Sequence, residues 1–252
     1  MKEGNEVTTP RKKTQTDTPR LPRAERERLI VEGAVQFFAE VGFGGDTREL
    51  AKRLNITHPL LFRYFASKNA LIERVYQEVF IGRRNPYWEI VISNRNVPLR
   101  ERLVNVYQAL AQTVLNYDWV RLFMFAGLKG SDINGRWYSF MQEHLVRPVC
   151  AEFRHDLGLP TIEEMPLTQN ESELVLGVNS RIFYLGVRKF IYGVDTPENV
   201  DAWVEMEIIL FLDGVVNIYP GLVAPPQRRV RKPRLARATK KRPSPLDVAS
   251  IG

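Results

Sequence analysis

The segment 47–68, with the sequence TRELAKRLNITHPLLFRYFASK, constrains the fold most, because it has the pattern of two short helices joined by a tight turn. Thr47 is positioned to cap the first helix. Asn55 tolerates the left-handed backbone that a sharp turn needs, and the apolar Ile56 can fill the angle between the two helices. The residues before the turn have the three-and-four spacing of one buried helical face: Leu50, Ala51 and Leu54. The segment therefore predicts a helix-turn-helix.

The second helix of this pair is expected to begin at Thr57 or His58, with Pro59 in its first turn. Leu61 and Phe65 are four residues apart and should face the first helix. The opposite face then offers hydrogen-bond donors, a cation, an aromatic ring and an apolar contact from His58, Leu60, Arg63 and Tyr64. Such a helix fits the major groove of double-stranded DNA. An ordinary pair of packed helices with a mixed surface is the alternative.

The flanking sequences distinguish these two interpretations. Upstream, ERLIVEGAVQFFAEVGFGGDT resembles the first helix and glycine-rich turn of the tetracycline-repressor (TetR) family, and downstream FRYFASKNALIERVY resembles its aromatic run, lysine and fourth helix. The resemblance covers residues 24 to 80, and beyond residue 80 it rests on helical layout and length. It implies an all-α fold, with an N-terminal three-helix DNA-binding domain and a C-terminal helical domain for ligand binding and dimerisation.

The resemblance also implies roles for single residues. It places Thr47 and Arg48 at positions that touch DNA from the first helix of the pair, and arginine is suited to read a guanine edge. It implies base contacts from residues 58–60 and phosphate contacts from Tyr64 and Lys68. The full set of expected DNA-binding residues is Thr47, Arg48, Thr57, His58, Pro59, Leu60, Phe62, Arg63, Tyr64 and Lys68.

Two residues depart from the family pattern. Phe62 stands where the family usually has a tyrosine whose hydroxyl reaches a phosphate, and a phenyl ring cannot donate a hydrogen bond. Asn55 replaces the usual glycine, but asparagine tolerates the same backbone. The phosphate contact at residue 62 therefore lacks its usual donor, whereas the turn at residue 55 keeps a residue that suits its backbone.

Composition indicates an ordinary soluble chain. Of 252 residues, 44% are hydrophobic and 26% are charged. Apolar runs such as IILFL fall far short of the ~20 residues that cross a bilayer, and the N-terminus has no apolar signal region, so a cytoplasmic location is expected. Cys150 is the single cysteine, and its spacing from His144 and His155 places the three on different helix faces, so neither a metal nor a cofactor is expected.

The net charge of +7 is unevenly distributed. Residues 223–252 carry +8, so the rest of the chain carries −1. Residues 1–23 are too polar to fold, and we expect a disordered arm there and a basic, disordered tail at 223–252. The predicted domains between them are a helix-turn-helix domain at 24–70 and a helical effector-binding and dimerisation domain at 71–222.

Helical spacing continues through the larger domain. One helix should run from Lys68 into it, and RNPYWEIVISNRNVP should interrupt the helices before a new one begins near Pro98. A short helix ending at 127–130 and a longer one ending at Gly158 carry many aromatic side chains, which are either plain core or the lining of a cavity for an apolar ligand. The candidate effector-binding residues are Trp119, Phe123, Trp137, Phe140 and Met141.

After a loop at 159–170, residues 171–193 and 197–219 are predicted to form two long helices that are more apolar than one core-facing stripe requires. In the TetR family the last two helices pair with their copies in a second chain, which implies a homodimer through residues 171–219. The alternative is that these helices are central in a monomer.

Together these observations predict a ligand-responsive transcriptional regulator that is not an enzyme. We expect a repressor that binds a palindromic operator as a homodimer and is released by a small apolar effector. A helical enzyme is less consistent with the sequence, because no Ser/His/Asp set, carboxylate pair or phosphate loop stands out. A non-specific DNA-binding scaffold that uses the basic tail is the other alternative.

Overall fold

The computed structural model describes residues 21–83 and 87–223, and these residues form helices without any β-strand. The predicted all-α class is confirmed. Within these ranges no helix is both long and apolar enough to cross a membrane. The expectations for residues 1–20 and 224–252, which include most of the predicted arm and tail, lie outside the described residues.

Three helices form the small N-terminal unit at one end of the molecule: α1 (Arg23–Val41), α2 (Thr47–Arg53) and α3 (His58–Tyr64). α1 buries one apolar face against the rest of the small unit, with Phe37 and Phe38 at 1% and 0% exposure. Val41, the last residue of α1, is apolar but 42% exposed. Its side chain lies beside Gly45, in the turn that follows the helix, and so covers this turn instead of the core.

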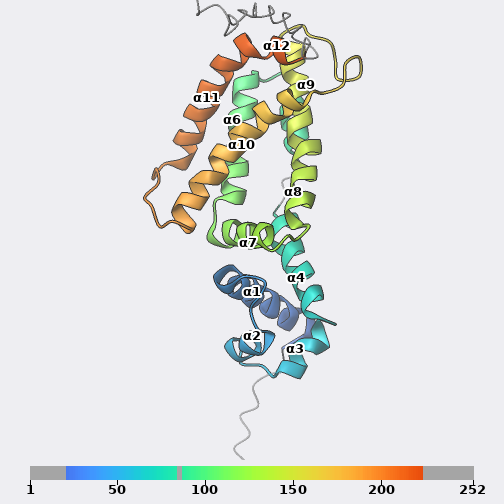
Figure 1. The fold of residues 1–252 in the computed structure, drawn as a ribbon, viewed down its shortest axis with the longest axis vertical. Coiled ribbons are helices and arrows are strands. Elements are labelled where there is room, and N and C mark those ends of the chain that lie inside the picture. Colours follow the sequence, from blue (N-terminus) through green and yellow to red (C-terminus); the bar gives the residue numbers. More distant parts are fainter. Residues whose placement is uncertain (1–20, 84–86, 224–252) are drawn as a thin grey trace, which may run out of the picture.

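The fourth helix connects the two parts of the chain (Figure 1). α4 (Lys68–Tyr76) continues without a break into a π-helical turn, η1 (Gln77–Ile81), in which the Gly82 amide donates to the Gln77 carbonyl. Phe80 in this turn is fully buried. The predicted helix from the small domain into the larger one is therefore present, with one widened turn at its end.

The segment after residue 86 contains a helix that the sequence interpretation missed. α5 (Trp88–Ser93) occupies part of the stretch that was predicted to interrupt the helices. Trp88 and Ile92, four residues apart, are 2% and 0% exposed, so this single face is enough to hold a six-residue helix against the core.

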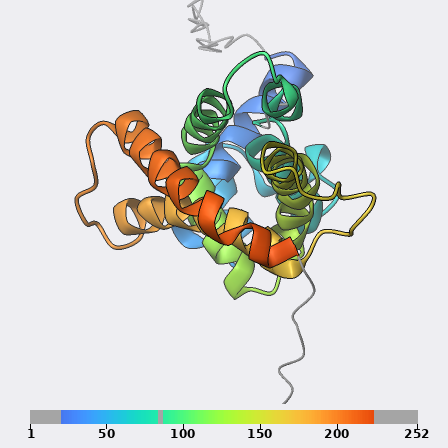
Figure 2. The ribbon, with the colours of Figure 1, turned by 90° about the horizontal axis from the view of Figure 1, so that it is seen from above.

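The larger unit is a bundle with α11 (Val200–Ile218) at one edge and α8 (Ile133–Met141), η2 (Gln142–Val146) and α9 (Arg147–Asp156) at the other (Figures 1 and 2). Between these edges lie α6 (Leu99–Val114) and α10 (Gln169–Phe190). α7 (Tyr117–Leu128) lies across the end of the bundle next to α1, and α12 (Pro220–Val223) closes the described chain.

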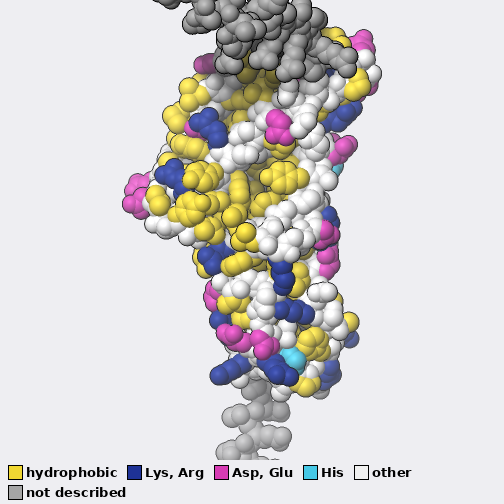
Figure 3. Space-filling model, viewed as in Figure 1, with side chains coloured by type: hydrophobic (Ala, Val, Ile, Leu, Met, Phe, Trp, Pro, Cys, Tyr) yellow, Lys and Arg dark blue, Asp and Glu magenta, His cyan; other side chains and the backbone are white. Residues whose placement is uncertain are grey.

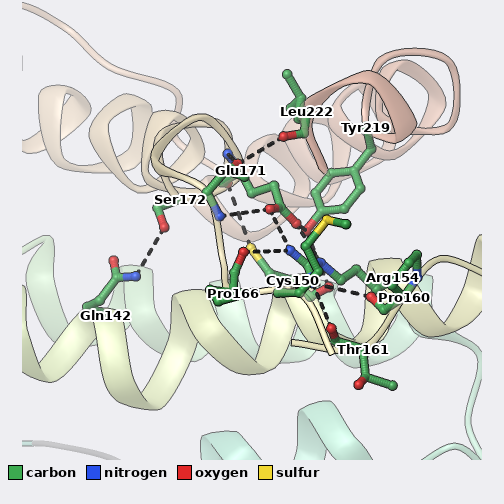
Figure 4. A network of polar contacts seen from close by, with 12 residues as sticks. Gln142, Cys150, Arg154, Pro160, Thr161, Pro166, Glu171, Ser172, Tyr219 and Leu222 are labelled. Carbon is green, nitrogen blue, oxygen red and sulfur yellow. Dashed lines mark hydrogen bonds and ion pairs between the residues drawn. The ribbon is translucent and has the colours of Figure 1, made fainter. Parts of the chain in front are cut away.

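A buried polar network joins α9, α10 and the end of α11 (Figure 4). Arg154 and Glu171, with side chains only 1% and 0% exposed, form an ion pair with donor–acceptor distances of 2.8 and 2.7 Å. The Tyr219 hydroxyl donates to the same carboxylate at 2.8 Å, and Arg154 also donates to carbonyls of the loop before α10. This network fixes the far end of the bundle, on the side away from the small unit.

Candidate DNA-binding site and effector cavity

The turn between α2 and α3 has the predicted geometry. Asn55 has a positive φ of 52°, and the Ile56 amide donates to the Ala51 carbonyl at 3.0 Å. Thr57 caps α3, because its side chain accepts a hydrogen bond from the Leu60 amide at 3.3 Å. The two apolar residues that were predicted to face α2, Leu61 of α3 and Phe65 directly after it, are buried. The pair is a helix-turn-helix, and α3 is its second helix.

The cap of α2 was predicted wrongly. Asp46, not Thr47, is the capping residue, and its carboxylate accepts from the Arg48 amide at 2.8 Å. A carboxylate at a helix N-terminus also interacts favourably with the helix dipole. Thr47 is instead the first helical residue, and its Oγ1 lies 3.0 Å from Nε2 of His58. This contact fixes the start of α2 against the start of α3.

The expected DNA-binding residues differ in their accessibility. Arg48, Thr57, Pro59 and Arg63 are exposed, whereas Thr47, His58, Leu60, Phe62 and Tyr64 are half-buried. Phe62 contacts the His58 ring edge-on, with the ring centroids 4.9 Å apart. The two exposed arginines contrast with Arg53, which forms ion pairs with Glu40 and Glu49 at 2.5 and 2.9 Å. The guanidinium groups that face solvent on this pair of helices therefore include those of Arg48 and Arg63.

Lys68 begins α4, and its ammonium group donates to the Gly45 carbonyl at 2.5 Å. Burial lowers the pKa of Lys68 below its ordinary value, and the charge of Lys129 lowers it further. An ammonium has three donors, so the bond to Gly45 leaves capacity for a phosphate oxygen. The same bond holds the glycine-rich turn before α2 against α4.

A cavity of about 90 Å³ lies in the larger unit, between α6, α7, α8 and α10. Four of the five candidate effector-binding residues line it: Trp119, Phe123, Trp137 and Met141. Phe140 does not, because its ring packs against Trp88 of the unpredicted helix α5 and against His144. The remaining lining residues were not predicted from the sequence, and they are Leu110, Val114, Tyr138, Leu176, Asn179, Ser180 and Phe183.

The aromatic rings around this cavity form one cluster with the end of the α4 segment. Trp119 stacks on Phe123, with centroids 4.8 Å apart and planes 14° apart, and meets Trp137 edge-on at 5.1 Å. Phe80 of η1 contacts Trp119 at 5.2 Å. A ring that belongs to the continuation of α4 therefore packs directly on the cavity lining.

The comparisons with known proteins agree with this geometry. Residues 30–75 match the family model described as bacterial regulatory proteins, tetR family. The N-terminal domain is a TetR-family DNA-binding domain. No curated protein matches the chain.

Solved structures show that the TetR-like fold extends beyond this domain. A TetR-like transcriptional regulator from a Rhodococcus species is similar over 77% of this chain and 100% of its own, with a TM-score of 0.56 and 21% identity. A TetR-family transcriptional regulator from Streptomyces coelicolor is similar over 81% of this chain and 88% of its own, with a TM-score of 0.51 and 15% identity. Together with the family match, this fold supports a DNA-binding regulator.

Two arginines of the larger unit hold the TetR-family domain in place. Arg136 of α8 forms an ion pair with Glu73 of α4 at 2.9 Å, and its guanidinium lies 3.7 Å from the centre of the Tyr76 ring. This arginine lowers the pKa of Glu73. Arg121 of α7 donates to the Ala39 and Glu40 carbonyls at the end of α1, at 2.5 and 3.1 Å.

The turn after α1 adds a close backbone approach. Gly42 ends α1 with a φ of 78°, and a Cβ there would lie 2.9 Å from the Phe125 ring of α7. Only glycine satisfies both the left-handed backbone and this contact. The TetR-family domain is thus attached to the larger unit at α1 and at α4.

Proposed function

We propose that this protein is a transcriptional repressor that binds a palindromic operator as a homodimer and dissociates when a small apolar molecule occupies the aromatic cavity. The observation that carries the proposal is the helix-turn-helix of α2 and α3, whose exposed side presents Arg48 and Arg63. Arginine can donate two hydrogen bonds to a guanine edge, which makes it the commonest base-reading side chain.

The proposed DNA contacts divide into two classes. Arg48 and residues 57–60, at the start of α3, would read base edges, since the N-terminal residues of a recognition helix contact the bases. Tyr64 and Lys68 would contact phosphates and set the position of the domain on the duplex without reading sequence. The contact between Thr47 and His58 supports this division, because it holds the ends of the two helices that would approach the groove together.

The proposed dimer uses the outer faces of α10 and α11. Tyr184, Met206, Leu210 and Val216 lie there with 53%, 47%, 56% and 58% of their surface exposed. Hydrophobic side chains gather over this region of the molecule (Figure 3). A contiguous exposed apolar surface is typical of an interaction site, and a second copy of the same surface would give a two-fold dimer through residues 171–219. Its two DNA-binding domains would meet half-sites about one helical turn, ~34 Å or more, apart.

The proposed release mechanism acts through α4. A molecule in the cavity displaces the rings of Trp119 and Trp137, which pack on Phe80 at the end of the α4 segment. Movement of this segment changes the spacing of the two DNA-binding domains. Ligand and DNA then favour different placements of the DNA-binding domains, so each lowers the protein's affinity for the other by the same factor. The coupling free energy is typically about 1–3 kcal/mol.

Selection of bound fragments from random duplex DNA by the purified protein tests the regulatory function. The expected product is a defined inverted repeat. A single unrepeated half-site would contradict the homodimer, and fragments without a common sequence would contradict the operator itself.

The placement of the effector is tested separately, with the selected operator and the compounds that release it. Trp137→Ala and Phe123→Ala should abolish or weaken release, because both rings line the cavity. Ser139→Ala is the control, since Ser139 is on the same helix as Trp137 but is exposed and does not line the cavity. Equal release by all three variants would contradict the placement.

A further inference from the structure

The cavity contains one polar side chain that has no partner in the protein. Asn179 of α10 lines it, and both the Nδ2 and Oδ1 atoms of its amide are buried without a hydrogen bond among the described residues. The neighbouring Ser180 differs, because its hydroxyl donates to the Leu176 carbonyl at 2.9 Å. The amide of Asn179 therefore offers a donor and an acceptor at this cavity that have no partner among the described residues.

A buried amide whose donor and acceptor both lack a partner destabilises the folded protein. A buried donor or acceptor without a partner costs about 1–3 kcal/mol, and the large majority of buried polar atoms in proteins do have partners. Trp119 also lines the cavity, and its indole Nε1 is likewise buried without a partner among the described residues. At a cavity, a bound molecule can supply the complementary atoms for such groups.

The rest of the lining limits the chemistry of that molecule. The described residues around the cavity include aromatic, aliphatic, hydroxyl and amide side chains but no charged one. Burial of an isolated carboxylate or ammonium without a counter-charge is strongly unfavourable, so the ligand is uncharged. The volume of about 90 Å³ is of the same order as the ~150 Å³ of an engineered cavity that binds benzene, so the cavity can hold about one aromatic ring.

We propose that this cavity recognises an uncharged, single-ring aromatic compound that carries a carboxamide or cyclic amide. The amide N–H of the ligand donates to Oδ1 of Asn179, and its carbonyl accepts from Nδ2, so that one ligand group satisfies both unpaired atoms. The ring packs among Trp119, Phe123 and Trp137. That such a ligand also releases DNA rests on the proposed function above.

The test compares three single-ring probes with the full-length protein: benzamide, benzoate and toluene. Binding is measured by calorimetry and by quenching of tryptophan fluorescence, since two tryptophans line the cavity. We expect benzamide to bind about 10- to 100-fold more tightly than toluene, as two hydrogen bonds to buried groups would give, and benzoate not to bind. Equal or tighter binding of toluene, binding of benzoate, or no binding of any probe would overturn the proposal.

Substitution of the asparagine provides the second part of the test. Asn179→Leu should remove the preference for benzamide and leave toluene binding equal or stronger, whereas Asn105→Leu, at an exposed position of α6, should keep the preference. Asn179→Ser gives a second measurement if the leucine variant does not fold, and it should reduce the preference at least tenfold. A preference for benzamide that persists in a folded Asn179 variant would refute the role of this side chain.

Release of the selected operator by benzamide is measured in a separate assay, so the two proposals fail independently. Amide-selective binding that depends on Asn179 but leaves DNA bound would support the ligand class and contradict the effector role. Operator release by aromatic compounds without amide preference would support the effector role and overturn the ligand class.

Discussion

Replacement of Glu171 by glutamine should destabilise the larger domain by several kcal/mol. The carboxylate accepts hydrogen bonds from two nitrogens of Arg154, from the Thr168 amide at 2.9 Å and from the Tyr219 hydroxyl. Glutamine keeps the shape but removes the charge, and so leaves the guanidinium of Arg154 buried without an anion. Removal of one partner of a buried ion pair costs about 3–5 kcal/mol.

The pKa of Glu171 gives a second measure of this interaction. Burial alone would raise the pKa, but the hydrogen bonds from Arg154, Thr168 and Tyr219 outweigh it and lower the pKa from 4.5 to about 2. Each pKa unit equals ~1.4 kcal/mol, so this shift corresponds to about 3 kcal/mol. The two measures agree.

The shift also fixes the pH dependence. The pKa is lower in the folded state than in the unfolded state, so the ionised carboxylate stabilises the fold above about pH 4.5. This contribution disappears as the pH falls from about 4.5 towards 2, where the folded protein also binds the proton. The difference in the free energy of unfolding between the native protein and Glu171→Gln should therefore be largest at pH 7 and should become smaller below pH 4.5.

Denaturant unfolding at fixed protein concentration, at several values between pH 7 and pH 3, measures this difference. Glu173→Gln is the matched control, because Glu173 lies on the same helix but is exposed. The control should change stability by less than about 0.5 kcal/mol. A difference below about 1 kcal/mol for Glu171→Gln at pH 7, or one that stays constant down to pH 3, would refute the reasoning.

Three further predictions concern DNA binding and its control. Arg48→Ala should weaken operator binding and relax base preference, whereas Lys68→Ala should weaken binding to all sequences alike; competition assays with operator mutants would contradict this if the effects were reversed. Arg136→Met should leave ligand affinity nearly unchanged but reduce the effect of ligand on operator affinity several-fold, because the variant cannot form the ion pair to Glu73 of α4. Binding titrations in which ligand lowers the operator affinity of the variant and of the native protein equally would contradict this prediction. Truncation after Val223 removes most of the basic tail and should make the salt dependence of binding shallower by roughly 0.9 log unit for each phosphate that the tail neutralises, with sequence preference intact. If truncation left the salt dependence unchanged for both operator and random DNA, the tail would not bind the duplex.

The sequence predicted the helix-turn-helix well because its determinants are local. The spacing of Leu50, Ala51 and Leu54 indicates one buried face, and Asn55 adopts the left-handed backbone by its own side-chain chemistry. The cap of α2 was off by one residue because Asp46 and Thr47 are adjacent and both can cap a helix. Only the geometry of the chain shows which of the two side chains reaches the amide.

The parts that were missed depend on contacts between distant segments. α5 has two buried residues on six, which is too short a pattern for helical periodicity to identify. The Trp88 ring of this helix contacts Phe140, and the sequence around Phe140 does not indicate that contact. Asn179 is one of many polar residues on α10, and nothing near it in the sequence indicates that this helix lines the same cavity as α7 and α8.

The π-helical turn at Gln77–Ile81 determines how DNA-binding domains can be exchanged between such regulators. A π turn accommodates one more residue than an α-helical turn, and each residue added or removed rotates the helix that follows by about 100° and moves it by ~1.5 Å. Phe80 would then leave the aromatic cluster. A chimaera that replaces residues up to Tyr76 with the corresponding domain of a relative should therefore keep residues 77–81 unchanged and preserve the number of residues between Glu73 and Phe80. Joined in that register, the new DNA-binding domain would keep the contact between Phe80 and the aromatic cluster through which we propose that ligand acts on DNA binding.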